Sequence, residues 1–379
     1  MDFKLTEEQE LIRASVREFT QKYLEPIAEE IDEESRYPQE VMDKIAEMDW
    51  LGIPFPTEYG GAGADFQTFA IVIEELSRAC ASTGFTVSAT TGLVLNPINL
   101  FGTEEQKKKY MIPICKGQKV GAFALTEPGA GTDAGAIVTT AVLDGDEYVI
   151  NGTKTFISNG PLADVFVIIA TSDPAKGAKG MSAFIVPKEA GGISVGKHFK
   201  KMGLRASQTS EVIFKDCRIP KENLLGEEGK GFRIAMQSLD GGRLGIAAQS
   251  VGILQACLDE SIQYAKERVQ FGKPISRNQA IQWMIVDMDS DLNAARLLTY
   301  YAAYLRDQGL PYGKETATAK LYGSEAANRH ASKAVQIHGG IGYMKGTKVE
   351  RLMRDAKITE IYEGSSEAHR MVIAGNIIR

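Results

Sequence analysis

The stretch AIVTTAVLDGDEYVINGTKTFIS, residues 136–158, lies between two regions of helical sequence. It is rich in β-branched residues, and it contains the turn pairs Asp144-Gly145 and Asn151-Gly152, which are typical of hairpins. Further apolar runs follow at 165–172, 181–188 and 210–219, without an amphipathic helix between them. Because a parallel sheet needs helical crossovers, this pattern predicts an antiparallel β-sheet domain, to which we assign residues 119–228.

The sequence on both sides of this region has the spacing of helices. Residues 1–118 contain two capping-box patterns, Thr6 with Gln9 and Thr103 with Gln106, and predict an N-terminal α-helical domain. Long helical patterns over 231–271, 278–309 and 314–340, followed by shorter ones near 347–356 and 366–378, predict a C-terminal domain similar to a four-helix bundle over residues 229–379. The predicted fold class is therefore α+β, in three domains.

Composition limits the function classes that need to be considered. The net charge of −6 over 379 residues argues against general affinity for nucleic acid. The four cysteines are scattered without a CxxC pair, which predicts neither a zinc site nor a disulfide framework and favours a reducing, cytoplasmic location. The start MDFKLTEEQE does not resemble a signal peptide, and no apolar run approaches the ~18 residues of a membrane span, so we expect no membrane partner.

Several short motifs match ligand-binding patterns but lack the surroundings that those patterns require. Residues 129–134, GAGTDA, match a dinucleotide fingerprint without a βαβ unit, and residues 191–198 resemble a P-loop in which His198 replaces the required Ser or Thr. The HGG at 338–340 has no GxSxG nucleophile elbow to accompany it, and the four histidines do not have the spacing of zinc ligands. We therefore predict no metal site.

Near the C-terminus, residues 358–370 read ITEIYEGSSEAHR, with a break between two helical segments. One interpretation is a simple turn, in which Glu363 is solvated, Gly364 takes a positive φ angle, and Ser365 or Ser366 caps the next helix. The other is a carboxylate placed for chemistry. The residues of this stretch alone leave both interpretations open.

Five motifs, taken in order, resemble those of the acyl-CoA dehydrogenase family, and the resemblance covers the whole chain. They are FALTEPGAGTD (123–133), NGTKTFISNG (151–160), ERVQFGKPI (267–275), QIHGGIGY (336–343) and EIYEGSSE (360–367). The segment SLDGGRLGIAAQ (238–249) is most similar to the short-chain, butyryl-CoA branch. The resemblance implies FAD-dependent conversion of a short-chain acyl-CoA to trans-2-enoyl-CoA, with Glu363 as the α-proton base and hydride transfer to flavin N5. It also implies electron transfer to electron-transferring flavoprotein, and a homotetramer that is a dimer of dimers.

The resemblance also assigns binding residues by position. In the sheet region, the FAD-binding residues would be Phe123, Ala124, Leu125, Thr126, Gly131, Thr132, Phe156, Ile157 and Ser158. Residues that in the family reach the FAD of a neighbouring subunit are Arg268, Gln270, Phe271, Gln279, Gln336, Ile337, His338, Gly339 and Gly340. Ser365 and Glu367 would contact the cofactor beside the base. The substrate-binding residues would be Thr132, Ser207, Asp240, Arg243, Tyr362 and Gly364.

Three of these positions differ mildly from the residues that are common in the family. Phe156 is often Trp, Thr132 is often Ser, and Ser365 is often Thr; none of the differences removes a chemical role.

Alternatives remain within and outside this class. A glutaryl- or branched-chain acyl-CoA dehydrogenase is one, but glutaryl enzymes carry an arginine in the segment that matches STGFTVSA (82–89), which is uncharged here. An acyl-CoA oxidase is disfavoured because those chains are considerably longer. A non-catalytic acyl-CoA- or flavin-binding protein on the same fold is the alternative from another class, and the presence of Glu363 argues against it.

Overall fold

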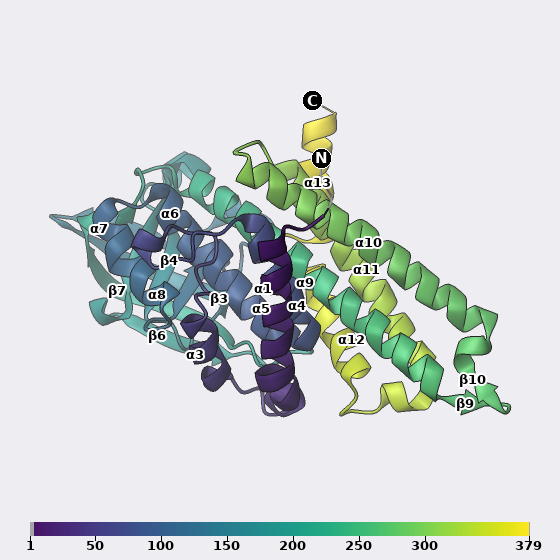
Figure 1. The fold of residues 1–379 in the computed structure, drawn as a ribbon. Coiled ribbons are helices and arrows are strands. Elements are labelled where there is room, and N and C mark those ends of the chain that lie inside the picture. Colours follow the sequence, from purple (N-terminus) through teal and green to yellow (C-terminus); the bar gives the residue numbers. More distant parts are fainter. Residues whose placement is uncertain (1–3, 379) are drawn as a thin grey trace.

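The computed structural model describes residues 4–378, and its first region consists of helices (Figure 1). Both predicted capping boxes are present, at the start of α1 and of α7, with each threonine accepting from the glutamine N–H and each glutamine side chain accepting in return. Three turns of π-helix interrupt the region, η1 (Thr20–Leu24), η4 (Thr90–Leu95) and η5 (Lys107–Met111). The α-helices are α1 (Glu7–Phe19), α2 (Ala28–Glu33), α3 (Gln39–Glu47), α4 (Phe66–Ala79), α5 (Ala81–Ala89), α6 (Asn96–Phe101), α7 (Glu104–Gln106) and α8 (Ile112–Cys115).

A sheet of strands β1 to β8 follows, with the order β6-β7-β3-β2-β4-β5-β8 and with β1 added beside β4. The pairs β2–β3, β3–β7, β6–β7, β4–β5 and β5–β8 are antiparallel, as predicted, whereas β1 runs parallel to β4 and Thr140 of β2 forms a parallel bridge to Thr171. The strands are β1 (Gly121–Ala124), β2 (Thr140–Asp144), β3 (Glu147–Ser158), β4 (Val165–Thr171), β5 (Met181–Pro187), β6 (Ile193–His198), β7 (Thr209–Pro220) and β8 (Leu224–Leu225).

The two turn pairs of the stretch 136–158 have different outcomes. Asp144 and Gly145 form the predicted hairpin turn between β2 and β3, and Gly145 has a φ angle of 65°. The hairpin predicted at Asn151-Gly152 is wrong, because both residues lie inside β3, where the register shifts between Ile150 and Gly152. A Cβ atom at Gly152 would lie 2.3 Å from the hydroxyl oxygen of Thr139, so this glycine provides room for packing at a bulge and does not end a strand.

The C-terminal region is again helical, so the predicted fold class is confirmed. It contains α9 (Gly231–Glu267), α10 (Gln279–Asp307), α11 (Gly313–His338), α12 (Lys348–Thr359) and α13 (Ser366–Ile377). The three longest helices contact one another, and a short hairpin of β9 (Val269–Gln270) and β10 (Lys273–Pro274) connects α9 to α10. Figure 1 shows this hairpin at the end of the bundle that is remote from α13. Within residues 4–378, no helix combines the length and the apolar character that crossing a membrane requires.

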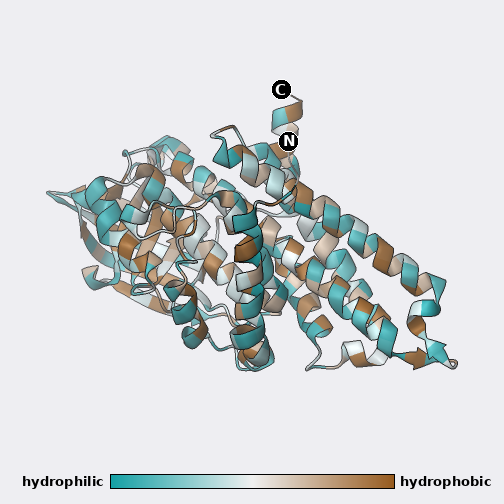
Figure 2. Ribbon diagram, in the orientation of Figure 1, coloured by the Kyte–Doolittle hydropathy of each residue, from teal (hydrophilic) through white to brown (hydrophobic). Residues whose placement is uncertain are grey.

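The core is continuous across the three regions. Residues of α1, α3 and α4 form one apolar cluster with Leu244 of α9 and Ala303 of α10. Strand β4 is buried on both faces, with Val167 facing the cluster that contains Tyr110 and Ile114, and Phe166 facing the cluster on the other side of the sheet. The hydropathy colours of Figure 2 agree with this arrangement, since hydrophobic and hydrophilic positions alternate along α1 and α10. The N-terminal helices therefore pack directly on the bundle, and α9 contacts them along its length.

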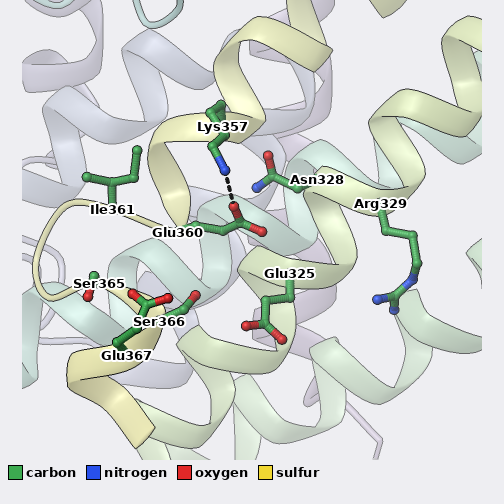
Figure 3. Close-up of a pocket in the computed structure, with 9 residues that line it drawn as sticks. All are labelled: Glu325, Asn328, Arg329, Lys357, Glu360, Ile361, Ser365, Ser366 and Glu367. Carbon is green, nitrogen blue, oxygen red and sulfur yellow. Dashed lines mark hydrogen bonds and ion pairs between the residues drawn. The ribbon is translucent and has the colours of Figure 1, made fainter.

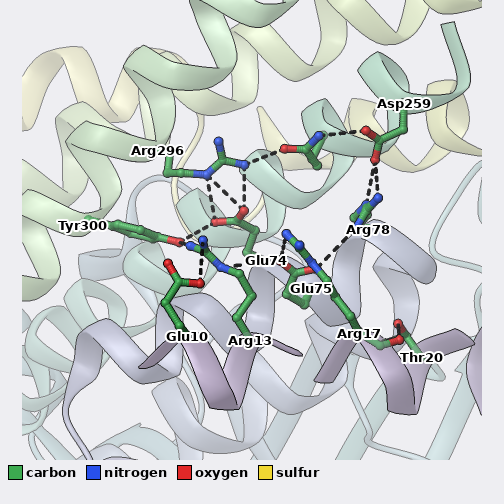
Figure 4. A network of polar contacts seen from close by, with 11 residues as sticks. Glu10, Arg13, Arg17, Thr20, Glu74, Glu75, Arg78, Asp259, Arg296 and Tyr300 are labelled. Carbon is green, nitrogen blue, oxygen red and sulfur yellow. Dashed lines mark hydrogen bonds and ion pairs between the residues drawn. The ribbon is translucent and has the colours of Figure 1, made fainter. Parts of the chain in front are cut away.

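A buried ionic network connects these helices (Figure 4). Glu74 and Glu75, adjacent on α4, are both almost completely buried. Arg296 of α10 lies 2.8 Å from Glu74, and the Tyr300 hydroxyl also donates to Glu74 at 2.8 Å. Arg17 of α1 binds Glu75 through two hydrogen bonds of 2.8 and 2.9 Å. Since buried carboxylates need compensating cations, this network fixes α1 and α10 to α4.

The Arg296–Glu74 pair provides a test of that statement. Arg296→Met leaves Glu74 buried without its cation, so we expect the free energy of unfolding to fall by about 3–5 kcal/mol. The double variant Glu74→Leu/Arg296→Met removes both charges and should recover much of the loss. Arg36→Met is the matched control, because Arg36 pairs with Glu30 and Glu40 at the surface, where ion pairs contribute little to stability. Urea unfolding curves measure all three variants, and equal losses for Arg296→Met and Arg36→Met would contradict the assignment.

Candidate active site

The loop between α12 and α13 carries Glu363 toward the interior. Glu363 and Gly364 both have positive φ angles, 52° and 101°, and the left-handed region is uncommon for a glutamate. Ser365 then caps α13, because its hydroxyl oxygen accepts from the Ala368 N–H at 3.3 Å. The positive φ of Gly364 and the serine cap agree with the interpretation of a simple turn. The solvated glutamate that this interpretation expects is not observed. Both carboxylate oxygens of Glu363 are buried and have no hydrogen-bond partner among the described residues.

Burial controls the electrostatics of this carboxylate. Removal from water raises the pKa of Glu363 to about 7, while the nearby cations Lys320 and Arg243 act in the opposite direction. A carboxylate with a pKa close to neutral is ionised in part at pH 7 and is still basic enough to accept a proton from carbon. Because buried polar atoms in proteins normally have hydrogen-bond partners, we expect a bound ligand to supply a partner for this carboxylate.

Room for the carboxylate comes from a glycine pair on α9, Gly241 and Gly242. A Cβ atom at Gly242 would lie 2.0 Å from Oε2 of Glu363. On another side, a Cβ atom at Gly92 of η4 would lie 3.1 Å from the Cα of Gly242. The unusual pair in mid-helix therefore allows the close approach of both a neighbouring helical turn and the Glu363 side chain.

Tyr362, the residue before the carboxylate, is fixed by its surroundings. Its hydroxyl donates to the side-chain oxygen of Gln249 on α9, and its ring lies 4.9 Å from the Phe85 ring on α5, centroid to centroid. Burial raises the pKa of Tyr362 well above its usual value. Tyr362 therefore anchors the loop to two helices, which is a role that the sequence did not predict for this candidate substrate residue.

Asp240 and Arg243 lie one turn apart on α9, as their spacing predicts. The Arg243 Nη1 atom is 2.6 Å from Asp240 Oδ1, and Arg243 is buried. Its Nε atom has no partner within the described part of the chain. Burial raises the pKa of Asp240, while the Arg243 charge opposes that effect. The pair is thus an oriented donor–acceptor group near the carboxylate of Glu363, whose pKa Arg243 lowers.

The loop 125–132, which carries several of the candidate flavin residues of the sheet region, has a rigid base. Glu127 accepts from the backbone N–H groups of Val138 and Thr139 and pairs with buried Lys154 at 2.8 Å. Lys154 also donates to the Leu125 carbonyl at 2.9 Å, so the start of the loop 125–132 is held in place. At the loop tip, Cβ atoms on Gly129 and Gly131 would meet no described atom within 4 Å. Such a glycine-rich rim leaves space for close approach by a ligand.

Phe156 lies at the bulge near the end of β3, where it has a φ angle of 57° and is 63% exposed. Its ring is 4.9 Å from the Phe199 ring, centroid to centroid. An exposed flat ring beside an open glycine loop fits a planar cofactor that carries phosphate groups, as FAD does.

The other candidates of the sheet region differ in their exposure. Ala124 and Ile157 are buried in the core of the sheet, and Leu125 is buried in the cluster on the other face. Thr132 is exposed, whereas Phe123, Thr126 and Ser158 are half-buried.

The second group of candidates lies at the end of the bundle that carries the β9–β10 hairpin. Phe271, at the hairpin tip, has a φ angle of 52° and is 99% exposed. His338 stacks on Tyr264 at 4.2 Å, and Ile337 is buried. The exposed members are Arg268, Gln270, Gln279, Gln336, Gly339 and Gly340. A single chain does not bring this group to Glu363, since the hairpin and α13 lie at opposite ends in Figure 1.

Two further sets of candidates have different surroundings. Ser207 is buried, and its hydroxyl has no partner in the described part of the structure, so its side chain does not lie on an open surface. Ser365 and Glu367 line an open pocket of roughly 540 Å³ between α11, α12 and α13 (Figure 3). Lys357 and Glu360 form an ion pair of 2.6 Å in the same pocket, which Glu363 does not line.

The sequence analysis did not single out two buried groups beneath the loop, Lys320 and His369. The Lys320 Nζ atom donates to the Gly364 carbonyl at 2.6 Å, and the His369 ring would lie 3.1 Å from a Cβ atom on Gly364. A signal for Lys320 existed, because it occupies the inward-facing stripe of its helix with Thr316, Ser324 and Ala327. Among the described residues, no group of three or more His, Cys, Asp or Glu side chains could hold a metal ion.

The fold and the site together define a class, the flavin-dependent oxidoreductases with a buried carboxylate. The family follows from three family models that match in sequence: acyl-CoA dehydrogenase N-terminal domain at residues 6–118, middle domain at 122–217 and C-terminal domain at 229–378. The chain belongs to the acyl-CoA dehydrogenase family.

Individual relatives are similar over the full length. The short-chain specific acyl-CoA dehydrogenase of Clostridium acetobutylicum is 54% identical, with 100% of both chains covered. The acryloyl-CoA reductase (NADH) of Anaerotignum propionicum is 51% identical, covering 100% of this chain and 96% of the relative. Among solved structures, butyryl-CoA dehydrogenase from Megasphaera elsdenii is 44% identical, with a TM-score of 0.98 and full coverage of both chains. A chain solved in work on the electron transferring flavoprotein of Acidaminococcus fermentans is 49% identical, with a TM-score of 0.99 and full coverage of both.

Proposed function

We propose that the protein is a FAD-dependent dehydrogenase that converts a short-chain, butyryl-CoA-like acyl-CoA to trans-2-enoyl-CoA. The observation that carries the proposal is the Glu363 carboxylate, which is buried, unpartnered among the described residues and positioned by a left-handed turn. The family and the 54% identity to a short-chain specific acyl-CoA dehydrogenase support the substrate class.

In this reaction Glu363 removes the α-proton of the acyl-CoA. The burial that raises its pKa makes it basic enough to accept that proton, and its backbone N–H polarises the thioester oxygen. Gly242 cannot accept a proton, and Asp240 is paired with Arg243, so neither competes for the role of base. A bound FAD supplies the acceptor for the hydride that leaves the β-carbon.

Binding and orientation are the tasks of the other candidates. Phe156 and the loop 123–132 hold the flavin within one chain, and Asp240 and Arg243 orient the CoA arm and the thioester end. Tyr362 and Gly364 border the substrate next to the base. Ser365 and Glu367 contact the cofactor from the helical side, where Ser365 is already fixed as the cap of α13. We also propose that the boundaries between the three domains lie at residues 118/119 and 228/229.

The remote group around Arg268 serves the FAD of a neighbouring subunit, so the active protein is an oligomer, a dimer of dimers. Its exposed Phe271 and an apolar face of α10 that includes Trp283 and Val286 support this assembly. We propose electron-transferring flavoprotein as the redox partner, because a chain 49% identical to this one was solved in work on the electron transferring flavoprotein of Acidaminococcus fermentans. We also propose a cytoplasmic location, which the scattered cysteines favour.

A second candidate is the reverse reaction, reduction of a 2-enoyl-CoA. It is favoured by one observation, the 51% identity to an acryloyl-CoA reductase. The same residues serve both directions by microscopic reversibility, since Glu363 would then return a proton to the α-carbon. Addition of crotonyl-CoA to the reduced enzyme, followed as recovery of the yellow colour, measures this direction.

The first prediction concerns the base. Glu363→Gln should keep FAD and bind butyryl-CoA, but flavin bleaching by butyryl-CoA should slow by on the order of 10²–10⁴ or more, because proton removal is lost. In the unaltered protein the bleaching rate should rise as the pH increases through about 7, where the Glu363 carboxylate becomes ionised. Stopped-flow absorbance measures both. Glu360→Gln, which changes the neighbouring carboxylate paired with Lys357, is the control. Near-normal bleaching in Glu363→Gln would place the base elsewhere.

The second prediction concerns chain length. Butyryl-CoA and hexanoyl-CoA should have higher kcat/KM values than octanoyl-CoA or longer substrates in a dye-acceptor assay, because segment 238–249 resembles the short-chain branch and the segment 82–89 is uncharged. A higher value for octanoyl-CoA than for butyryl-CoA would refute the short-chain assignment, and preference for glutaryl-CoA would support the alternative within the family.

The third prediction concerns assembly. Sedimentation of the flavin-loaded protein should give a tetramer, and Arg268→Ala should reduce flavin content because a charged partner of the neighbour's pyrophosphate is lost. Arg277→Ala, an exposed arginine close to the same hairpin, is the control. A flavin-loaded monomer would exclude a cofactor site that is shared between subunits.

A further inference from the structure

Lys320 is a fully buried lysine for which the proposed reaction has no stated use. Its relative exposure is 0%, and its Nζ atom lies 2.6 Å from the Gly364 carbonyl oxygen, to which it donates. Lysine is rarely buried completely, because removal of an ammonium group from water is costly. A lysine at such a position therefore needs a compensating charge nearby.

The compensating charge comes from the loop above it. Glu363 exerts the strongest electrostatic influence on Lys320, and that influence favours the charged ammonium. The reciprocal effect is also present, since Lys320 is the first of the two cations that lower the pKa of Glu363. The second cation, Arg243, is already paired with Asp240 at 2.6 Å.

The other charged or titratable groups around the loop have less influence on Glu363. His369 on α13 is buried beneath Gly364, and burial together with the cations Lys320 and Arg243 lowers its pKa to about 3, so it is neutral. Glu360, directly after α12, is paired with Lys357, and Glu367 of α13 is exposed. The titratable and charged groups around Glu363 are therefore Lys320 and Arg243 on the helices packed against the loop, His369 and Glu367 on α13, and Tyr362 and Glu360 in the loop itself.

We propose that Lys320 is a positioning residue for the reaction: its ammonium group holds the Gly364 carbonyl, and with it the left-handed Glu363-Gly364 turn, and its charge favours the ionised form of the Glu363 carboxylate. This inference rests on the proposed role of Glu363 as the base. Lys320 contributes by fixing the base and by keeping it ready to accept a proton.

The geometry of the turn supports this role over simple space filling, and the electrostatics of the pair agree with it. The turn has two consecutive residues at positive φ, a conformation that persists only where the surroundings hold it, and Lys320 donates to the carbonyl of the second of them, Gly364. Burial also lowers the pKa of Lys320 to about 7 and raises that of Glu363 to about 7, so each group depends on the other for its charge near neutral pH.

The test compares Lys320→Met with Lys320→Arg and with Lys333→Met, an exposed lysine on the same helix. Each holoenzyme is mixed with butyryl-CoA in a stopped-flow instrument between pH 5.5 and 9.5. Loss of the charge at position 320 should move the acidic limb of the bleaching rate to higher pH by about one unit or more. At pH 7 the rate should then be about fivefold or more below that of the unaltered protein, because a one-unit rise from a pKa of about 7 lowers the ionised fraction of the base from about one half to about one tenth.

The conservative variant and the binding measurement make the test specific. Lys320→Arg keeps a cation and should leave the acidic limb close to its original pH, and Lys333→Met should not move it. The dissociation constant of butyryl-CoA, measured in the Glu363→Gln background, reports the effect of Lys320→Met on the turn alone, because glutamine at position 363 has no charge for Lys320 to influence. If the methionine variant does not retain FAD, Lys320→Gln serves the same comparison.

The outcomes are separable. The inference would be overturned if the acidic limb of the bleaching rate lay at the same pH in Lys320→Met and in the unaltered protein. A rate that falls by the same factor at every pH is one such result, and it is the result expected of a purely structural lysine. An unaltered protein that butyryl-CoA does not bleach at all would instead refute the proposed function.

Discussion

The exclusion of water from the Glu363 carboxylate is the constraint on which the rest of the site depends. A carboxylate without a hydrogen bond is costly to bury, and several features of the fold make that burial possible. Gly242 leaves room for the Oε2 atom, Gly92 lets η4 approach α9, and Tyr362 ties the loop to Gln249. Each element belongs to a different stretch of the chain, so the carboxylate is buried only when the N-terminal helices, α9 and the last loop are assembled together. The buried Glu74 and Glu75 network fixes part of that assembly.

Much of the fold was predictable because its signals are local. The capping boxes at Thr6 and Thr103, the Asp144-Gly145 hairpin and the periodicity of the long helices depend on residues a few positions apart. The errors and omissions have tertiary causes. Asn151-Gly152 has the composition of a hairpin turn, but the neighbouring Thr139 side chain requires a glycine inside the strand. The parallel pairing of β1 with β4 joins residues that are more than forty positions apart, and no local pattern reports it.

The candidate site was predictable in a different way. Glu363 could be singled out only through the family resemblance, because the sequence ITEIYEGSSEAHR taken alone favours a solvated turn. The structure adds information that the motif lacks: both carboxylate oxygens of Glu363 are buried, and two cations, Lys320 and Arg243, influence them. The sequence analysis did not single out Lys320, because a lysine among the several charged residues of this helix resembles a solvated position. Only its place in the inward stripe with Thr316 and Ser324 distinguishes it.

The two halves of the site have opposite requirements, and this explains how the chain divides them. Glu363, the proposed base, needs a dry environment, which one chain provides by packing α9, α11 and the last loop together. A cofactor-binding surface, in contrast, must stay open until the cofactor binds. Three features of the chain are open in this way: the exposed Phe156, the glycine-rich loop near Gly131 and the hairpin tip at Phe271. Exposed aromatic side chains are costly in water, so surfaces of this type are stabilised when a ligand or a second subunit covers them. In the proposed assembly the cofactor covers the first surface and a neighbouring chain covers the second, so cofactor binding and subunit association should stabilise each other, by the same linkage that couples any two ligands of a folded protein.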